Sequence, residues 1–323
     1  MSKIVTLQNA ARAFPDRERP VHLALGVFDG AHRGHRAIFQ AAVAGARKAN
    51  GVPAVLTFDP HPQVLFAGTG AVKLIYPLEQ RFQIFEDCGF EKIVCEPFTR
   101  EFAAIPAQDF LSYLKKKIPS LAAVYCGENF HFGSRRAGNT KDLPVLAMRS
   151  GIDSTAVPAV KWEGAPVSST RIRAALESGQ IEAANAMLSE DYFMTGTVIG
   201  GNRLGRTIGF PTLNVPWTPE TRVPFGAYAV RLVDLETGTD FEGVANYGVR
   251  PTIGDLKTMA PLLESHLLVP AGTPVPGYGA KVRVSLISFL RPEQKFLSLE
   301  ALKSQLEQDK TAALQKFLEK NKT

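Results

Sequence analysis

The stretch VHLALGVFDGAHRGH, residues 21–35, passes from an apolar run through a glycine-rich turn into a segment with helical spacing. Gly26, Gly30 and Gly34 let the backbone turn sharply and approach a ligand closely. A strand, a tight turn and a helix in this order form the repeating unit of an α/β fold. The stretch therefore predicts an N-terminal α/β domain with a binding loop after a strand.

The same alternation continues through the first half of the chain. Near-continuous apolar runs predict strands covered on both faces, at Val21–Val27, Pro53–Phe58, Lys92–Cys95, Ala122–Cys126 and Asp153–Val160. Segments with helical spacing lie between them, over 34–49, 77–88 and 106–117. This alternation predicts a parallel, doubly wound, Rossmann-like sheet, whose ligand lies outside the carboxyl ends of the strands.

The second half has a different texture. Short β-rich runs between residues 192 and 290 are broken by Gly and Pro clusters, which predicts a small antiparallel β-barrel, with a sandwich as the alternative. The tail predicts an amphipathic helix packed on this domain, from the spacing of Phe296, Leu299, Leu302, Leu306, Ala313 and Phe317. We place the two domains at residues 1–187 and 188–323.

Length and composition agree with two globular domains. A single core rarely fills a chain of 323 residues. No apolar run is long enough to span a bilayer, and the N-terminus does not resemble a secretory signal, so we expect a cytoplasmic protein. Three cysteines are too few for a disulfide framework. The net charge of +6 suits an anionic partner, either a nucleic acid or a phosphorylated small molecule.

His32 and His35 lie at the start of the first predicted helix. A helix start presents unpaired N–H groups and the positive end of the helix dipole, and therefore binds phosphate. Two imidazoles on one side of the first turn can donate to a phosphate as negative charge develops on it. A shared zinc ion is an alternative, although no further ligand lies nearby in sequence. Histidines that only satisfy a turn are another.

The pattern GxFDGxHxGH resembles the HxGH signature of the nucleotidyltransferase superfamily in its flavin-specific form, and VSSTRIR (residues 167–173) looks like the ISSTxxR motif of the same superfamily. Hydroxyls and a guanidinium at a helix start suit a triphosphate, although Ser168 alone is also a normal N-cap. The resemblance implies that His32, His35 and Arg173 are catalytic. It also implies a set of ATP-binding residues: Gly26, Phe28, Asp29, Gly30, Gly34, Ser168, Ser169 and Thr170.

Two further stretches each follow a predicted strand, FDPHP (residues 58–62) and GENFHFG (residues 127–133). Both therefore fall at the carboxyl edge of the sheet. They are similar to the FEPxP and GxDFxFG stretches of bacterial FAD synthetases, which implies that Asp59, Pro60 and Asn129 bind the flavin. The commoner residues are Glu at position 59 and Asp at position 129, and the second exchange removes a charge beside the expected phosphate.

The run GGNRLGRTIGFPTLN, residues 200–214, carries most of the information in the second half. A glycine-rich loop with arginines can wrap a polyphosphate, although a glycine-rich hairpin corner has the same composition. A threonine hydroxyl and an asparagine carbonyl are hard oxygen ligands that suit Mg²⁺. The run closely resembles the riboflavin kinase signature GxxxGRxxGFPTxN. This implies an ATP site formed by Gly205, Arg206, Gly209, Thr212 and Asn214, with Mg²⁺ on Thr212 and Asn214.

More kinase-like pieces follow in the order of that family, among them ESHLL (residues 264–268) and FLRPEQKF (residues 289–296). A strand glutamate beside a hydroxyl substrate can act as a general base. The resemblance nominates Glu264 for this step and Arg291 for flavin binding. The chain departs from the family at Val269 and Pro270, where Asp-Phe is usual.

The chain is thus identified as a member of the bifunctional riboflavin kinase/FAD synthetase family. The resemblance implies that the second domain phosphorylates riboflavin to FMN with ATP, and that the first adenylylates FMN to FAD and releases pyrophosphate. Three alternatives stay open: one decayed module, an HxGH enzyme acting on nicotinate mononucleotide or phosphopantetheine, and a basic protein that binds nucleic acid. We expect riboflavin, FMN and ATP as partners, with no nucleic acid and no membrane; the sequence gives no oligomeric state.

Overall fold

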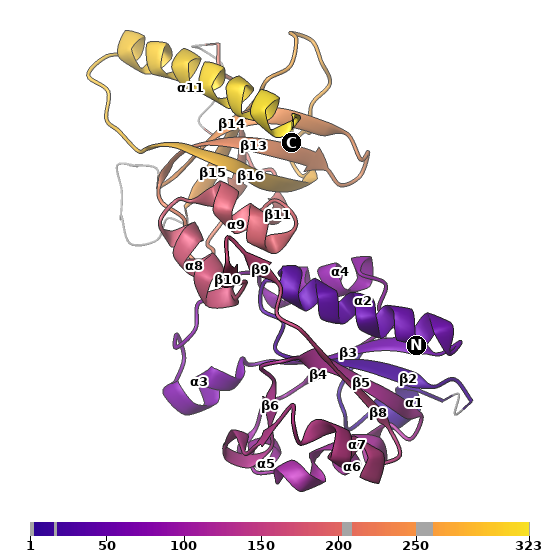
Figure 1. The fold of residues 1–323 in the computed structure, drawn as a ribbon. Coiled ribbons are helices and arrows are strands. Elements are labelled where there is room, and N and C mark those ends of the chain that lie inside the picture. The colour runs from indigo at the N-terminus through magenta and orange to yellow at the C-terminus, as the bar shows by residue number, and fades with distance from the viewer. Residues whose placement is uncertain (1–2, 16–17, 202–208, 250–260, 323) are drawn as a thin grey trace. The chain divides into compact units, whose positions relative to one another are not determined.

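The computed structural model describes residues 3–15, 18–201, 209–249 and 261–322 (Figure 1). Contacts within the chain divide it into two compact units, residues 1–169 and 170–323. The predicted boundary at 187/188 lies further along the chain. The contacts do not test which activity belongs to which part of the chain, so the boundary at 187/188 stays a prediction.

Six strands form the main sheet of the first unit, in the order β1-β4-β3-β2-β5-β8. Each pairing is parallel. The strands are β1 Ile4–Val5, β2 Val21–Leu25, β3 Val52–Phe58, β4 Lys92–Glu96, β5 Leu121–Gly127 and β8 Asp153–Val157. The predicted doubly wound α/β class is confirmed, and all five predicted strands are present. In β2 and β3 every residue is buried, as strands covered on both faces require.

Helices cover both faces of this sheet, with α2 and α4 on one face and α5, α6 and α7 on the other (Figure 1). Their bounds are α1 Ala10–Ala13, α2 Arg33–Lys48, α3 Pro62–Ala67, α4 Leu78–Asp87, α5 Arg100–Ala103, α6 Ala107–Lys117 and α7 Leu143–Arg149. A 3₁₀ turn spans Ser134–Arg136. Two short antiparallel pairs complete the unit: β6 His131–Phe132 with β7 Gly138–Asn139, and β9 Lys161–Trp162 with β10 Ala165–Pro166.

The topology fixes where a ligand can lie in the first unit. Strand β2 sits inside the sheet, with β3 and β4 to one side and β5 and β8 to the other. At such a reversal of strand order the connecting loops diverge, and a crevice opens at the carboxyl ends of the strands. The loop between β2 and α2, residues 26–32, starts at this point. The fold therefore puts the loop that the sequence singled out at the expected binding edge.

The second unit contains a six-stranded antiparallel sheet in the order β11-β16-β13-β14-β15-β12. Its strands are β11 Phe193–Thr197, β12 Leu213–Pro216, β13 Gly226–Asp234, β14 Asp240–Gly248, β15 Leu262–Leu267 and β16 Lys281–Pro292. The two edge strands approach each other just beyond β11, where the N–H of Ile199 donates to the carbonyl of Asn214 at 2.8 Å. The sheet therefore curls into a nearly closed barrel, as predicted.

In the described residues of the second half, the helices are α8 Ser169–Glu177, α9 Ile181–Leu188 and α11 Leu299–Lys320. The terminal helix α11 begins at Ser298, whose side chain accepts the N–H of Ala301 as an N-cap. Its Ala313 and Phe317 pack into a cluster with residues of β13, β14 and β16. The predicted C-terminal amphipathic helix is confirmed.

Candidate active sites

The loop after β2 has an unusual backbone. Phe28, Gly30 and Ala31 have φ angles of 55°, 82° and 42°, in the left-handed region that side chains disfavour. A Cβ atom on Gly26 would lie 2.7 Å from the ring of Phe28, and one on Gly30 would lie 2.7 Å from Ile75. Both glycines are therefore needed for close packing under the loop. The predicted glycine-dependent turn is present, and contact with phosphate stays a prediction.

Asp29 holds this loop in place from within. Its carboxylate accepts the N–H of Ile75 at 3.0 Å, and its carbonyl accepts the hydroxyl of Ser169 at 2.9 Å. The residue is buried. These bonds give Asp29 a structural part in the loop and place Ser169, from the second motif, beside the first. That Asp29 binds ATP stays a prediction.

The two histidines of the loop lie together. His32 is the N-cap of α2, and its Nδ1 accepts the N–H of His35 at 3.4 Å. The two rings stack with centroids 3.6 Å apart and planes 17° apart. The ring of His35 also meets Phe28 edge-on at 5.2 Å. Because Nδ1 of His32 accepts a hydrogen bond, its proton lies on Nε2, which is then the donor available to a ligand.

Burial keeps both rings neutral. It lowers the pKa of His32 from 6.5 to about 4. It also lowers the pKa of His35 well below its usual value, and the nearby His32 and the Arg81 guanidinium lower it further. At neutral pH the two histidines therefore act as uncharged N–H donors. Of the residues that the structure describes, no three His, Cys, Asp or Glu side chains group as a metal site, so the zinc alternative gains no support.

Arg81 is a buried cation that the sequence analysis missed. It lies on α4 and is 1% exposed. Its Nη2 donates to the carbonyl of Val27 at 2.6 Å and to the hydroxyl of Thr57 at 2.5 Å. Burial lowers the pKa of Arg81, and Asp29 is the first of the charges that oppose this shift. The guanidinium thus joins the loop after β2 to strand β3. It also places a positive charge near His35 in the histidine loop, residues 26–35.

The lowered histidine pKa values predict acid sensitivity. Above pH 6.5 His32 is neutral in both the folded and the unfolded chain. As the pH falls towards 4 the unfolded chain takes up a proton that the folded one excludes, so stability is lost. We expect His32 to contribute about 2 kcal/mol to the loss of unfolding free energy between pH 7 and pH 5. Urea titrations at both pH values measure this loss.

The matched variant is His32→Asn, whose amide oxygen can still cap α2 but does not titrate. It should lose about 2 kcal/mol less than the wild type over the same pH interval. An equal loss in both proteins would show that burial does not lower the pKa of His32 in the folded chain.

The remaining residues of the first predicted site lie at strand ends and on α8. Asp59 and Pro60 follow β3 and are joined by a cis peptide bond, and Asn129 follows β5. Since β3, β2 and β5 are parallel neighbours, these residues share the carboxyl edge of the sheet with the histidine loop. Ser168 precedes α8, while Thr170 and Arg173 lie on it, in the second contact unit. Flavin and ATP contacts for these residues stay predictions.

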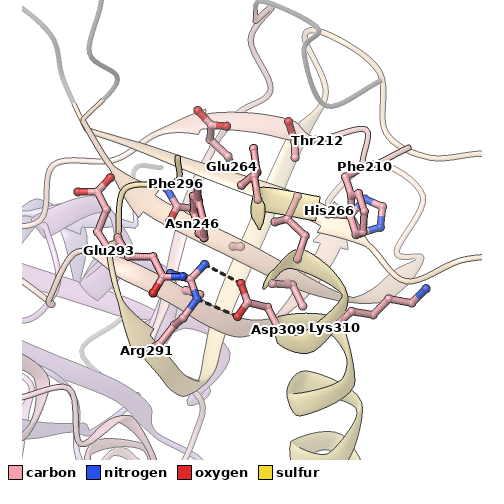
Figure 2. Close-up of a pocket in the computed structure, with 16 residues that line it drawn as sticks. Phe210, Thr212, Asn246, Glu264, His266, Arg291, Glu293, Phe296, Asp309 and Lys310 are labelled. Carbon is pink, nitrogen blue, oxygen red and sulfur yellow. Dashed lines mark hydrogen bonds and ion pairs between the residues drawn. The ribbon is translucent and has the colours of Figure 1, made fainter. Parts of the chain in front are cut away.

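The second unit has a cavity of about 250 Å³ (Figure 2). Its polar lining includes Thr212, Glu264 and His266, and its apolar lining includes Phe210 and Phe296. Helix α11 supplies one wall with Leu302, Leu306, Asp309 and Lys310. A mostly apolar cavity with a few polar side chains suits a ligand with a large ring and a polar chain.

One row of residues crosses five strands of the barrel. Glu264 on β15 pairs with Asn214 on β12 and with Asn246 on β14. Ala227 on β13 pairs in turn with Asn246 and with Arg291 on β16. Directly opposed residues of antiparallel strands project to the same face and have Cβ atoms about 5 Å apart. The ladder therefore brings the predicted base Glu264 to the start of β12, beside Asn214 and close to Thr212.

The glycine-rich run is described in part. Gly205 and Arg206 lie outside the described residues. Gly209 is exposed with a φ of 86°, and Thr212 follows it into the cavity lining. Asn214 is only 4% exposed, so little of its side chain reaches solvent. Thr212 and Asn214, the two oxygen ligands predicted for Mg²⁺, therefore lie two residues apart on a segment that borders the cavity. Metal binding itself stays a prediction.

Arg291 is held by an ion pair with α11. Its Nε and Nη2 donate to the two carboxylate oxygens of Asp309 at 2.8 and 2.7 Å (Figure 2). Gln305 donates to the same carboxylate at 2.9 Å. Asp309 is 3% exposed, so this two-bond contact is largely shielded from water. The pair joins β16 to the helical wall of the cavity, and a direct flavin contact by Arg291 stays a prediction.

Sequence reasoning also missed Asn246. It lines the cavity directly beside Glu264 in the strand ladder. The alternation of β14 puts Val244 and Asn246 on the same face, since side chains two apart in a strand point the same way. The available signal was a polar residue directly after the apolar pair Val244 and Ala245, but its pairing partner could not be read from one strand alone.

Comparisons with known proteins match both halves of the chain. Residues 14–171 match the family model for FAD synthetase, and residues 188–317 match the model for riboflavin kinase. A bifunctional riboflavin kinase/FMN adenylyltransferase from Escherichia coli (strain K12) is 37% identical over 91% of this chain and 92% of that protein. The protein of that description from Bacillus subtilis (strain 168) is 34% identical, with the same two coverages.

A solved structure described as a macrolide-efflux protein from Streptococcus pneumoniae has a similar fold along the whole chain. It superposes with a TM-score of 0.81 at 26% identity, and covers 97% of this chain and 99% of that one. Within the described part of this chain, no helix is both long and apolar enough to cross a membrane. Two family models in succession and two relatives matched over nine-tenths of their length lead to one assignment. The chain belongs to the bifunctional riboflavin kinase/FMN adenylyltransferase family.

Proposed function

We propose that this chain makes both flavin nucleotides: the barrel unit phosphorylates riboflavin to FMN, and the α/β unit converts FMN to FAD. The family models for the two activities match separate segments, which correspond to two units of different architecture. ATP is the second substrate of each reaction. The cytoplasmic location and the lack of a nucleic-acid partner stay predictions.

In the kinase reaction Glu264 takes the proton from the 5′-hydroxyl of riboflavin. The hydroxyl oxygen then bonds to the γ-phosphorus of ATP, the bond from that phosphorus to the bridging oxygen breaks, and ADP leaves. The apolar part of the cavity receives the flavin ring, and the Asp309–Arg291 pair holds the helical wall against it. The observation that carries this assignment is the row that sets Glu264 between Asn214 and Asn246.

Thr212 and Asn214 would hold Mg²⁺ in this unit. Thr212 lines the cavity and Asn214 pairs with Glu264, which supports a role for these two neutral oxygen ligands beside the proposed base. When bound, the ion neutralises charge on the phosphate oxygens. Glu264 and Asn246, which pair in the strand ladder, would orient the hydroxyl that reacts.

In the adenylyl transfer, a phosphate oxygen of FMN bonds to the α-phosphorus of ATP and pyrophosphate leaves. FMN phosphate is already ionised, so no strong base is required. The neutral rings of His32 and His35 donate hydrogen bonds to the α-phosphate, and the N-terminus of α2 adds its free N–H groups. Ser169, Thr170 and Arg173 bind the phosphates that leave.

Product analysis tests the proposal. Incubation of the purified chain with riboflavin, ATP and Mg²⁺ should produce FMN first and FAD later, separated by chromatography. FMN with ATP should give FAD and pyrophosphate in equal amounts. If FMN accumulates without FAD, or supplied FMN is converted while riboflavin is not, one module has lost its activity and the chain is monofunctional.

A further inference from the structure

The ladder between β12 and β15 stops at a defined residue. Its last pair is Leu213 with Ser265, and continuing the register by one step would set Thr212 opposite His266. The residue before Thr212 is Pro211, which has no N–H to donate to a neighbouring strand. Backbone pairing therefore ends where the residue proposed to bind Mg²⁺ and ATP begins.

Beyond the last backbone pair, a side chain of β15 makes the hydrogen bond to the neighbouring segment. Nδ1 of His266 lies 2.9 Å from the carbonyl oxygen of Pro211. Since a carbonyl only accepts, Nδ1 carries the proton and donates. The ring of His266 also packs on Phe210, with centroids 4.9 Å apart, and Figure 2 shows the two rings side by side. His266 thus contacts both residues that precede Thr212.

We propose that His266 is a positioning residue for the kinase reaction: it fixes the peptide between Pro211 and Thr212, and so holds the Thr212 hydroxyl in place for Mg-ATP. His266 and Glu264 are two apart on β15 and line the same cavity. Strand β15 therefore carries both the proposed base, Glu264, and the residue that holds the segment before Thr212, His266. This inference rests on the proposed kinase function.

Two substitutions separate the hydrogen bond from the packing. His266→Phe keeps a ring against Phe210 but has no donor. His266→Asn loses the ring, yet its amide nitrogen can take the place of Nδ1 as a donor. We expect H266F to raise the KM for Mg-ATP about threefold to tenfold, the range for one neutral hydrogen bond. The KM for riboflavin should stay near the wild-type value, and H266N should restore most of the Mg-ATP effect.

A second measurement does not depend on turnover. In the full chain without nucleotide, hydrogen-exchange mass spectrometry of the peptide covering residues 209–217 should show about threefold to tenfold faster exchange in H266F. H266N should exchange nearly as slowly as wild type. A general loss of stability would instead speed exchange across the whole barrel and raise both KM values.

The outcomes distinguish this inference from the proposed function. Wild-type KM for Mg-ATP and wild-type exchange in H266F would overturn the positioning role. So would equal effects of the Phe and Asn variants. If the wild-type chain makes no FMN, the kinase assignment fails, while the exchange experiment still tests whether His266 holds the turn. FAD formation from supplied FMN should be unchanged in both variants and confirms that the chain is intact.

Discussion

Glu264→Gln should reduce FMN formation from riboflavin by a factor of about 10² to 10⁴, the usual contribution of a general base. The amide has the size of the carboxylate but cannot take the proton of the 5′-hydroxyl. FAD formation from supplied FMN should be retained, because the histidine loop proposed to catalyse it lies in the other unit. Chromatography of the flavins after each reaction measures both rates on the same sample.

Glu293 provides the matched control for this variant. It is another glutamate in the lining of the same cavity, outside the row that contains Asn214 and Asn246. Glu293→Gln should change the FMN rate less than tenfold, since Glu293 has no part in the proton transfer. Equal losses in the two variants would mean that cavity charge matters and that Glu264 is not the base. Loss of both activities in E264Q would point to unfolding.

The histidine loop should give the reciprocal result. His35→Asn is expected to lower FAD formation from FMN by about 10² to 10³, the cost of removing a donor that stabilises charge in the transition state. FMN formation from riboflavin should stay close to wild type. His32→Asn should behave similarly, with a folded N-terminal unit, because the amide can still cap α2.

Separate measurement of kcat and of the KM for ATP tests the proposed catalytic role of these two rings. A donor that acts on the α-phosphate only in the transition state lowers kcat and kcat/KM together and leaves the KM for ATP nearly unchanged. A mere ground-state contact would raise KM at constant kcat. Retention of full FAD synthesis in His35→Asn would remove the histidine pair from the mechanism.

The sequence predicted most of the first unit because buried parallel strands are apolar along their whole length. The shortest strands were not predictable in this way. Strand β1, Ile4–Val5, has only two residues and exists because it pairs with Ile93 and Val94 of β4. The hairpins β6–β7 and β9–β10 are equally short. Pairings of this length depend on tertiary neighbours and leave no periodic pattern.

The same limit applies to the sites. The glycines and histidines of residues 26–35 could be found from the sequence because local chain geometry gives them their function. Arg81 could not, since it stands in an ordinary helix and reaches the loop only through the fold. Asn246 is likewise defined by its partner on β15. Asp29 belonged to the motif, but its inward bonds to Ile75 and Ser169 depend on residues distant in the chain.

The row of paired residues across the barrel limits where residues can be inserted or deleted in proteins of this family. Neighbouring residues in a strand face opposite sides, so a single inserted or deleted residue within β15 would turn Glu264 from the cavity-lining face of the sheet to the opposite face. Residues 269–278 lie between β15 and β16 and belong to no strand. Length and composition can drift there without moving the carboxylate, and this segment contains the unusual Val269 and Pro270.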